Sequence, residues 1–189
     1  MSDDNLCWVD LETTGSNVDH DEIIEIGAIL TTPTLEQIGD PFQQVLEPGP
    51  MALGRMMQNA VVREMHKANG LLADVLNDQG VRPHVAATKM LEWLDRYDHG
   101  DFRRGRNLIL AGSGVGHFDK RFIDKYLPQV SQRLRYYVLD IGVIRRAHRM
   151  WLGSDLSTAN DGKTHRALDD IKCHLDEARD FQRLWTAGQ

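Results

Sequence analysis

The stretch Trp8–Glu12 restricts the fold more than any other, because it predicts a buried strand that ends in two acids. Gly15 follows as the end of this strand. Asp10 and Glu12 are two residues apart, so on an extended chain both carboxylates point to the same face, with Cα atoms about 7 Å apart. On a central strand such a pair costs desolvation and mutual repulsion, unless a divalent cation that prefers oxygen ligands lies between them. The alternative interpretation is a solvated strand end that carries two acids. A metal site becomes the better interpretation only if acids from other segments lie nearby.

The composition narrows the class of protein. A chain of 189 residues that is 41% hydrophobic fits a single compact domain over residues 1–189. The 22 basic and 28 acidic residues give a net charge of −6, which argues against binding of long duplexes and favours a short, locally held nucleic acid. Cys7 and Cys173 form no C-x-x-C pair and indicate a reducing compartment. Without a signal peptide or a membrane-spanning apolar run, we expect a cytoplasmic protein with no membrane partner.

The pattern of apolar residues predicts an α/β fold. Three early strands with short connections suggest an antiparallel arrangement, and later strands that alternate with helices make the sheet mixed, with helices on its faces and the active site at strand ends. We expect turns at Pro33 and Pro41, on either side of Leu35–Asp40, and a loop over Glu47–Gly54. The expected strands are residues 6–13, 23–30, 42–46, 107–111 and 136–139. The expected helices are residues 59–66, 83–97, 118–127, 141–151 and 165–185.

Further acids come from two distant segments. Asp119 lies in the first turn of a predicted helix, with its apolar neighbours at i+3 and i+4 turned to the core. His165 precedes Asp169 and Asp170 at the start of the last helix. Together with the two acids of the first strand, Asp119 and one of Asp169 or Asp170 would form four carboxylates around one cleft. Two ions there would favour in-line attack on a phosphodiester, and a histidine beside them would accept the proton of the attacking water.

These motifs also resemble a known family. D-x-E-T-T-G at Asp10–Gly15, H-F-D at His117–Asp119 and H-x-x-x-x-D at His165–Asp170 are similar to the three motifs of the DEDDh 3′→5′ exonucleases, in the proofreading-exonuclease superfamily. Within that superfamily the resemblance is to oligoribonucleases, and it extends over nearly the whole chain. Further similar stretches are 6–12, 22–26, His66 with 69–71, 120–128, 136–140 and 167–171.

The resemblance implies a ribonuclease H-like fold and a metal-dependent enzyme. Asp10, Glu12 and Asp170 would hold one ion, and Asp10 and Asp119 a second, with Mg²⁺ or Mn²⁺ as the metal. His165 would be the general base. Geometry adds a condition, because on a continuous helix position i+5 lies roughly 140° from position i. His165 must therefore precede the helix for Asp170 to serve, whereas a helical His165 would favour Asp169 instead.

The resemblance also suggests substrate contacts and an oligomeric state. Thr13, Thr14 and Gly15 correspond to positions where the family's backbone meets the terminal 3′ hydroxyl. Leu11, His66 and Phe118 would contact the terminal base or phosphate, since stacking holds a base without regard to sequence. Tyr136 corresponds to a residue that acts across a dimer, so a homodimer is implied. The aromatic residue that the family places just before the histidine helix is not evident at Met56–Gln58.

The Gly112–Gly116 loop departs from the family pattern, because Gly114-Val115 stands where exonucleases of this superfamily often have His-Asn. Its three alternate glycines after a strand suggest a dinucleotide site, but His117 occupies the third glycine position of that fingerprint and Asp119 would repel a pyrophosphate.

We therefore expect a metal-dependent 3′→5′ exoribonuclease that releases nucleoside 5′-monophosphates from short single-stranded RNA. The alternatives are a related exonuclease acting on single-stranded DNA or on both nucleic acids, and a non-catalytic nucleic-acid-binding subunit.

Overall fold

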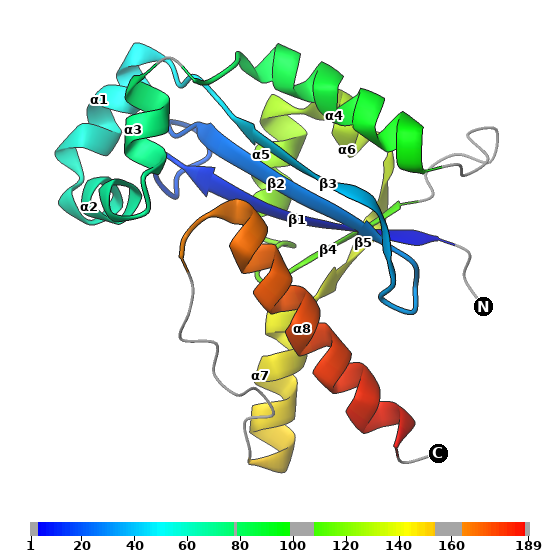
Figure 1. Cartoon of the computed structure of the whole chain (residues 1–189). Coiled ribbons are helices and arrows are strands. Elements are labelled where there is room, and N and C mark those ends of the chain that lie inside the picture. The colour runs from blue at the N-terminus through cyan, green and yellow to red at the C-terminus, as the bar shows by residue number, and fades with distance from the viewer. Residues whose placement is uncertain (1–3, 78, 99–107, 154–163, 188–189) are drawn as a thin grey trace.

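A five-stranded sheet forms the centre of the chain in a computed structural model that describes residues 4–77, 79–98, 108–153 and 164–187 (Figure 1). The order of the strands is β3-β2-β1-β4-β5. β1 pairs antiparallel with β2 and β2 with β3, whereas β1–β4 and β4–β5 are parallel. The expected mixed sheet, antiparallel through its first three strands, is confirmed. The strands are β1 Asn5–Thr13, β2 Ile23–Thr31, β3 Gln37–Val45, β4 Leu108–Gly112 and β5 Leu134–Asp140.

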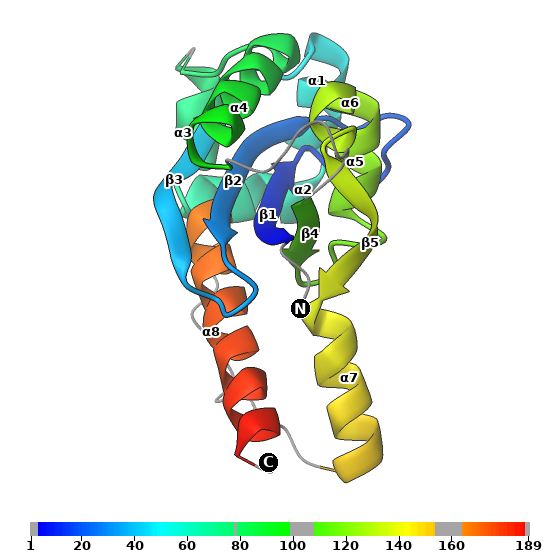
Figure 2. The same cartoon turned by 90° about the vertical axis from the view of Figure 1, so that its right-hand side faces the viewer.

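Helices cover both faces of this sheet. α4, α5 and α6 lie on one face and α7 and α8 on the other, while α1, α2 and α3 gather where β1 ends (Figures 1 and 2). No helix in the described ranges combines the length and apolarity needed to cross a membrane. The helices are α1 Pro50–Gln58, α2 Ala60–Ala68, α3 Leu71–Leu76, α4 Pro83–Tyr97, α5 Asp119–Tyr126, α6 Pro128–Ser131, α7 Ile141–Leu152 and α8 Ala167–Thr186.

The alternation of side chains along β1 determines where the acids emerge. Val9 and Leu11 pack into the core formed with α4, α5 and α6. Trp8 packs into the second core, which includes residues of α7 and α8. Asp10 and Glu12 are in phase with Trp8, so they lie on the α8 side of the sheet. The shared face expected of these two acids is thus the face against which the last helix packs.

The structure corrects the predicted extent of several elements. β3 begins at Gln37, earlier than the expected start at Phe42, so the turn expected at Pro41 was wrong. Pro41 lies within β3 because this strand is at the sheet edge, where a residue without an N–H is tolerated. The loop expected over Glu47–Gly54 was also wrong, since α1 begins at Pro50, a residue suited to the first helical position. α3 was not predicted, and Asn107, the expected start of β4, lies outside the described residues.

Candidate active site

The first two acids of the site lie at the end of β1. Glu12 is buried, with 7% of its surface exposed, and Asp10 is half-buried. The pairing of β1 with β2 shifts register between Glu12 and Thr13. Such an irregularity bends a strand and re-aims the residues beside it, and here it coincides with the point where β1 leaves the sheet.

Asp119 reaches the same place from the opposite side of the sheet. It is the first residue of α5 and is buried. Its Oδ1 accepts a hydrogen bond from the backbone N–H of Leu11 at 3.0 Å. This bond fixes the start of α5 to β1 between Asp10 and Glu12, so the predicted convergence of these three acids is present.

The start of α8 distinguishes between the two neighbouring aspartates. His165 precedes the helix and has a positive φ of 53°, so the geometric condition for Asp170 is met. Asp170 is buried. The Asp169 side chain is 48% exposed and accepts from Lys172 at 3.0 Å. That bond holds the pKa of Asp169 below its usual range. The structure therefore brings Asp170 to the site and turns Asp169 outward.

The electrostatics of this cluster fit a cation. Glu12, His165 and Asp170 each offer one potential ligand atom, all within 4.8 Å of one another. Burial raises the pKa of Glu12 to about 8, and repulsion from Asp170, Glu25 and Asp119 adds to the rise. A buried carboxylate that is costly to ionise among other acids is stabilised by a positive charge, and oxygen ligands of this kind suit Mg²⁺ and Mn²⁺. The residues present thus form an appropriate donor set for a divalent metal.

A single cavity of about 360 Å³ joins these groups. All five predicted catalytic residues line it, together with four of the predicted substrate residues. The nine are Asp10, Glu12, Asp119, His165 and Asp170, with Leu11, Thr13, Gly15 and Phe118.

Three of the predicted substrate residues do not line the cavity. The hydroxyl of buried Thr14 accepts from the backbone N–H of Glu22 at 3.0 Å, which fixes the loop after β1. Tyr136 lies on β5 and is 86% exposed. Both therefore lie outside the pocket in the single chain.

His66 lies behind the cavity wall and is fully buried. Its Nε2–H donates to the carbonyl of Thr13 at 3.0 Å. Its Nδ1 faces Oε2 of Glu12 at 3.9 Å. Burial lowers the pKa of His66, so the ring is neutral at pH 7. These contacts show a ring that holds the end of β1 in place and is shielded from the cavity.

Sequence reasoning missed the part of the cavity wall that comes from α2 and the residue before it. Asn59, Val62 and Met65 line the cavity from the start and middle of α2. The spacing of Val62 and Met65 by three residues would have indicated one face of a helix. Apolar side chains of α2 thus form part of the cavity wall.

The Gly112–Gly116 loop is held by a carboxylate of the protein itself. Asp140 accepts from the backbone N–H of Gly114 at 3.0 Å and from that of Gly116 at 3.3 Å. It also caps α7 through the N–H of Val143. The amide groups that would bind a dinucleotide phosphate are already paired, which agrees with the argument against such a site.

Comparisons with known sequences cover almost the whole chain. The RNase_T family, described as exonuclease, matches residues 7–177. An oligoribonuclease of Nocardia farcinica is 32% identical over 184 residues, which are 97% of this chain and 82% of that protein. An oligoribonuclease of Leifsonia xyli subsp. xyli is 34% identical over 173 residues, 90% of this chain and 78% of that protein.

Solved structures show the same fold in more distant proteins. An exonuclease I from Methylocaldum szegediense superimposes with a TM-score of 0.67 at 18% identity and covers 95% of this chain. An Escherichia coli exonuclease I in complex with single-stranded DNA gives a TM-score of 0.63 at 15% identity and covers 97% of this chain. The chain spans only 40% and 43% of the length of these two proteins. Their likeness to this chain lies in the ribonuclease H-like fold.

Proposed function

Because the chain belongs to the exonuclease family and is a 3′→5′ exonuclease, we propose that it degrades short single-stranded oligoribonucleotides to nucleoside 5′-monophosphates. The observation that carries the proposal is the convergence of Asp10, Glu12, Asp119, His165 and Asp170 on one cavity. These residues come from three distant segments, so their meeting at a single place agrees with a common chemical role.

Short RNA as the substrate is supported by the relatives and by the charge of the chain. Relatives at 32% and 34% identity are named oligoribonucleases. A net charge of −6 gives little general attraction for a long phosphate backbone. The cavity of about 360 Å³ is at the small end of the range for small-molecule pockets and suits one terminal nucleotide.

Four carboxylates would hold the metal. Asp10, Glu12 and Asp170 would bind one Mg²⁺ or Mn²⁺, and Asp10 with Asp119 a second. When bound, two such ions would supply Lewis-acid stabilisation of the negative charge that develops on the phosphoryl oxygens and on the leaving oxygen. The bond from Leu11 N–H to Asp119 orients that carboxylate before any ion is present.

His165 would act as the general base. Its ring lines the cavity and is exposed, so a water molecule can reach it. A histidine ring within reach of the attacking water can accept its proton as a general base. The loop position of His165, outside α8, lets it face the same space as Asp170.

The cavity walls would hold the terminal nucleotide. The lining includes four apolar side chains that offer surfaces for a base of any identity, namely Leu11, Val62, Met65 and Phe118. The backbone at Thr13 and Gly15 would meet the 3′ hydroxyl. The buried ring of His66 supports this wall through Thr13, and we assign it no direct contact with the base.

A homodimer is part of the proposal. Tyr136 is 86% exposed on β5, and Met150 and Trp151 on α7 are each 79% exposed. These exposed apolar side chains would be available to a partner chain. Light scattering of the purified protein would give twice the mass of one chain, whereas a monomer over the micromolar range would refute this part. We also propose a cytoplasmic location, in accord with Cys7 and Cys173, which remain as thiols.

The alternative substrate is single-stranded DNA, because one of the proteins with this fold binds single-stranded DNA in its crystal structure. The test is a series of labelled RNA and DNA strands from the dinucleotide upward, with Mg²⁺, with Mn²⁺ and with EDTA. The proposal predicts metal-dependent release of monophosphates and a preference for RNA of two to five units. Equal digestion of long DNA would instead favour the alternative.

Two variants separate catalysis from folding. Asp119→Asn keeps an oxygen that accepts from Leu11 N–H, and Asp10→Asn keeps the side-chain volume, so both should fold. Each should lose the metal-dependent activity. Full turnover in either variant would remove that residue from the mechanism, and binding of RNA without hydrolysis by the native chain would favour the non-catalytic alternative.

A further inference from the structure

His165 and Asp170 flank the start of α8 and must be placed by contacts with other parts of the chain. His165 has φ 53°, a left-handed conformation that costs energy for a residue with a Cβ. Such a conformation persists where the surroundings hold it in place. The contacts that do this therefore decide whether both side chains face the acids of β1.

Glu25 holds the start of α8 from β2. Its side chain is fully buried and accepts from Arg166 Nη2 at 2.7 Å and from Arg166 Nε at 3.1 Å. It also accepts from the backbone N–H of Ala167, the first helical residue, at 3.0 Å. Glu25 thus accepts from one of the N–H groups that have no partner within the helix, and its negative charge interacts favourably with the positive end of the helix dipole. It takes the place of a side-chain cap, which the N-cap residue Arg166 does not provide.

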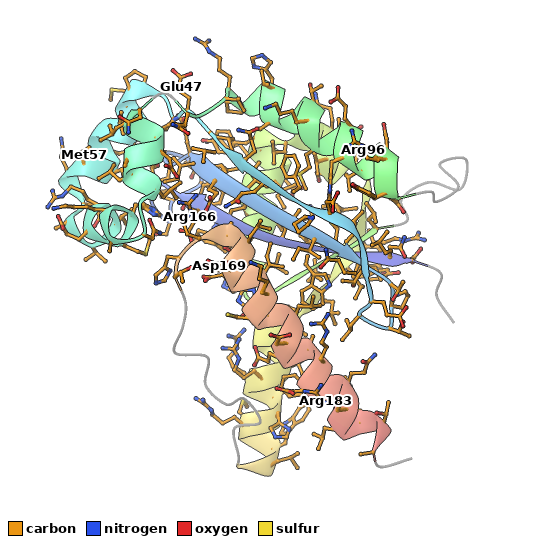
Figure 3. All side chains as sticks on the ribbon, viewed as in Figure 1. Glu47, Met57, Arg96, Arg166, Asp169 and Arg183 are labelled. Atoms are coloured by element: carbon orange, nitrogen blue, oxygen red, sulfur yellow. The ribbon has the colours of Figure 1, made fainter. Side chains whose placement is uncertain are left out.

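Arg166 ties the same place to α2 and α3. Its Nη1 donates to Asp74 at 3.0 Å, while the opposite edge of the guanidinium binds Glu25. Asn69, which follows α2, donates through its side-chain amide to the carbonyl of His165. In Figure 3 Arg166 lies at the start of α8, between this helix and the α1–α3 group. His165 and Arg166 are therefore held by β2, by α3 and by the residue that follows α2.

Gly27 lets α8 approach the sheet this closely. A Cβ at this position would lie 2.9 Å from the carbonyl carbon and Cβ of Ala167 and from the nitrogen of Leu168. Gly27 pairs with Asp10, and Glu25 pairs with Glu12. The two β2 residues that receive α8 are thus the direct neighbours of the two acids on β1.

We propose that Glu25 and Arg166 are positioning residues of the nuclease reaction, which hold His165 and Asp170 in register with Asp10 and Glu12. The inference rests on the proposed function for its catalytic consequence, whereas the positioning itself is a property of the chain. This positioning depends on the planar guanidinium of Arg166, because a guanidinium binds Glu25 and Asp74 at once and an ammonium does not.

Arg166→Met tests the proposal, since methionine replaces much of the side-chain volume and makes no hydrogen bond to Glu25. We expect kcat to fall about 10²-fold with KM changed less than threefold, because a displacement of the order of 1 Å in catalytic groups costs that much. Arg166→Lys should recover part of kcat. The matched control is Arg179→Met, an arginine further along α8 that binds Asp176 at 2.8 Å and the carbonyl of Leu35 at 3.3 Å, and it should leave kcat unchanged.

A second readout does not depend on activity. The amides of Asp169 and Asp170 bond to the carbonyl of Arg166, so their hydrogen exchange reports the order of the first turn of α8. Arg166→Met should raise their exchange rates at least tenfold, and Arg179→Met should not. Native exchange rates or native kcat in Arg166→Met would overturn the proposal.

Two further outcomes are kept apart. If Arg166→Met does not fold, Glu25→Gln/Arg166→Met replaces the pair by neutral residues of similar volume and carries the same expectations. If the native chain hydrolyses no RNA or DNA, the proposed function fails, and the exchange experiment still decides whether Arg166 orders the segment.

Discussion

Substitution of Glu12 by glutamine should stabilise the metal-free protein while it removes activity. Burial and the neighbouring acids raise the pKa of Glu12 from 4.5 to about 8. At about 1.4 kcal/mol per pKa unit, this difference corresponds to roughly 5 kcal/mol. An unfolded chain ionises Glu12 near pH 4.5, whereas the folded metal-free chain does so near pH 8. Stability is therefore lost as the pH rises from 4.5 to 8, and the full loss remains above pH 8.

Glu12→Gln removes this loss because glutamine carries no charge at any pH. With EDTA at pH 8.5 we expect a gain of roughly 3–5 kcal/mol in the free energy of unfolding. The gain is smaller than the full loss because burial of the glutamine amide has a desolvation cost of its own. For a chain of this size that is about 10 °C in Tm. At pH 5 the gain should be below about 1 kcal/mol, because pH 5 is only about half a unit above the pKa of Glu12 in the unfolded chain, and little of the loss has accumulated there.

Thermal denaturation followed by circular dichroism at the two pH values measures both gains. Glu36→Gln is the matched control, since Glu36 is exposed, and it should shift Tm by about 1 °C or less at either pH. Added Mg²⁺ should raise the Tm of the native chain and leave Glu12→Gln nearly unchanged. A Glu12→Gln protein no more stable than the native one at pH 8.5, or a gain independent of pH, would refute the electrostatic argument.

Further variants test the remaining residues. Asp170→Asn should abolish metal-dependent hydrolysis, whereas Asp169→Asn should leave kcat within about twofold, because Asp169 points outward to Lys172. His165→Ala should slow kcat by about 10²–10⁴-fold with the fold intact, and an unchanged rate would place the base elsewhere. His66→Ala should lower the free energy of unfolding by about 2–4 kcal/mol in urea denaturation, since it leaves a cavity and an unpaired Thr13 carbonyl.

Local pattern was enough to find the acids and the elements that carry them. The alternation of β1 predicted that Asp10 and Glu12 share a face, and the core residues on each side of the sheet agree with it. Pattern was weaker where apolar periodicity is short. β3 has one buried side chain, Phe42, so only the part of that strand around it was predicted.

The roles of the histidines and of the glycine loop required tertiary contacts. His66 was expected beside the substrate, yet it binds the Thr13 carbonyl behind the wall. The Gly112–Gly116 loop owes its conformation to Asp140, which lies on another strand. Neither partner is near in sequence, and a single sequence gives no signal that joins them.

The sequence by itself determined that four acidic positions and a histidine would be available at the ends of elements, because side-chain direction follows from local periodicity. The choice of Asp170 over Asp169 belongs to the tertiary structure, since it depends on where α8 begins relative to His165. That starting point is held by Glu25, 141 positions away from Arg166 along the chain. An ion pair of this kind forms only after β2 and α8 have packed together, so no local pattern encodes it.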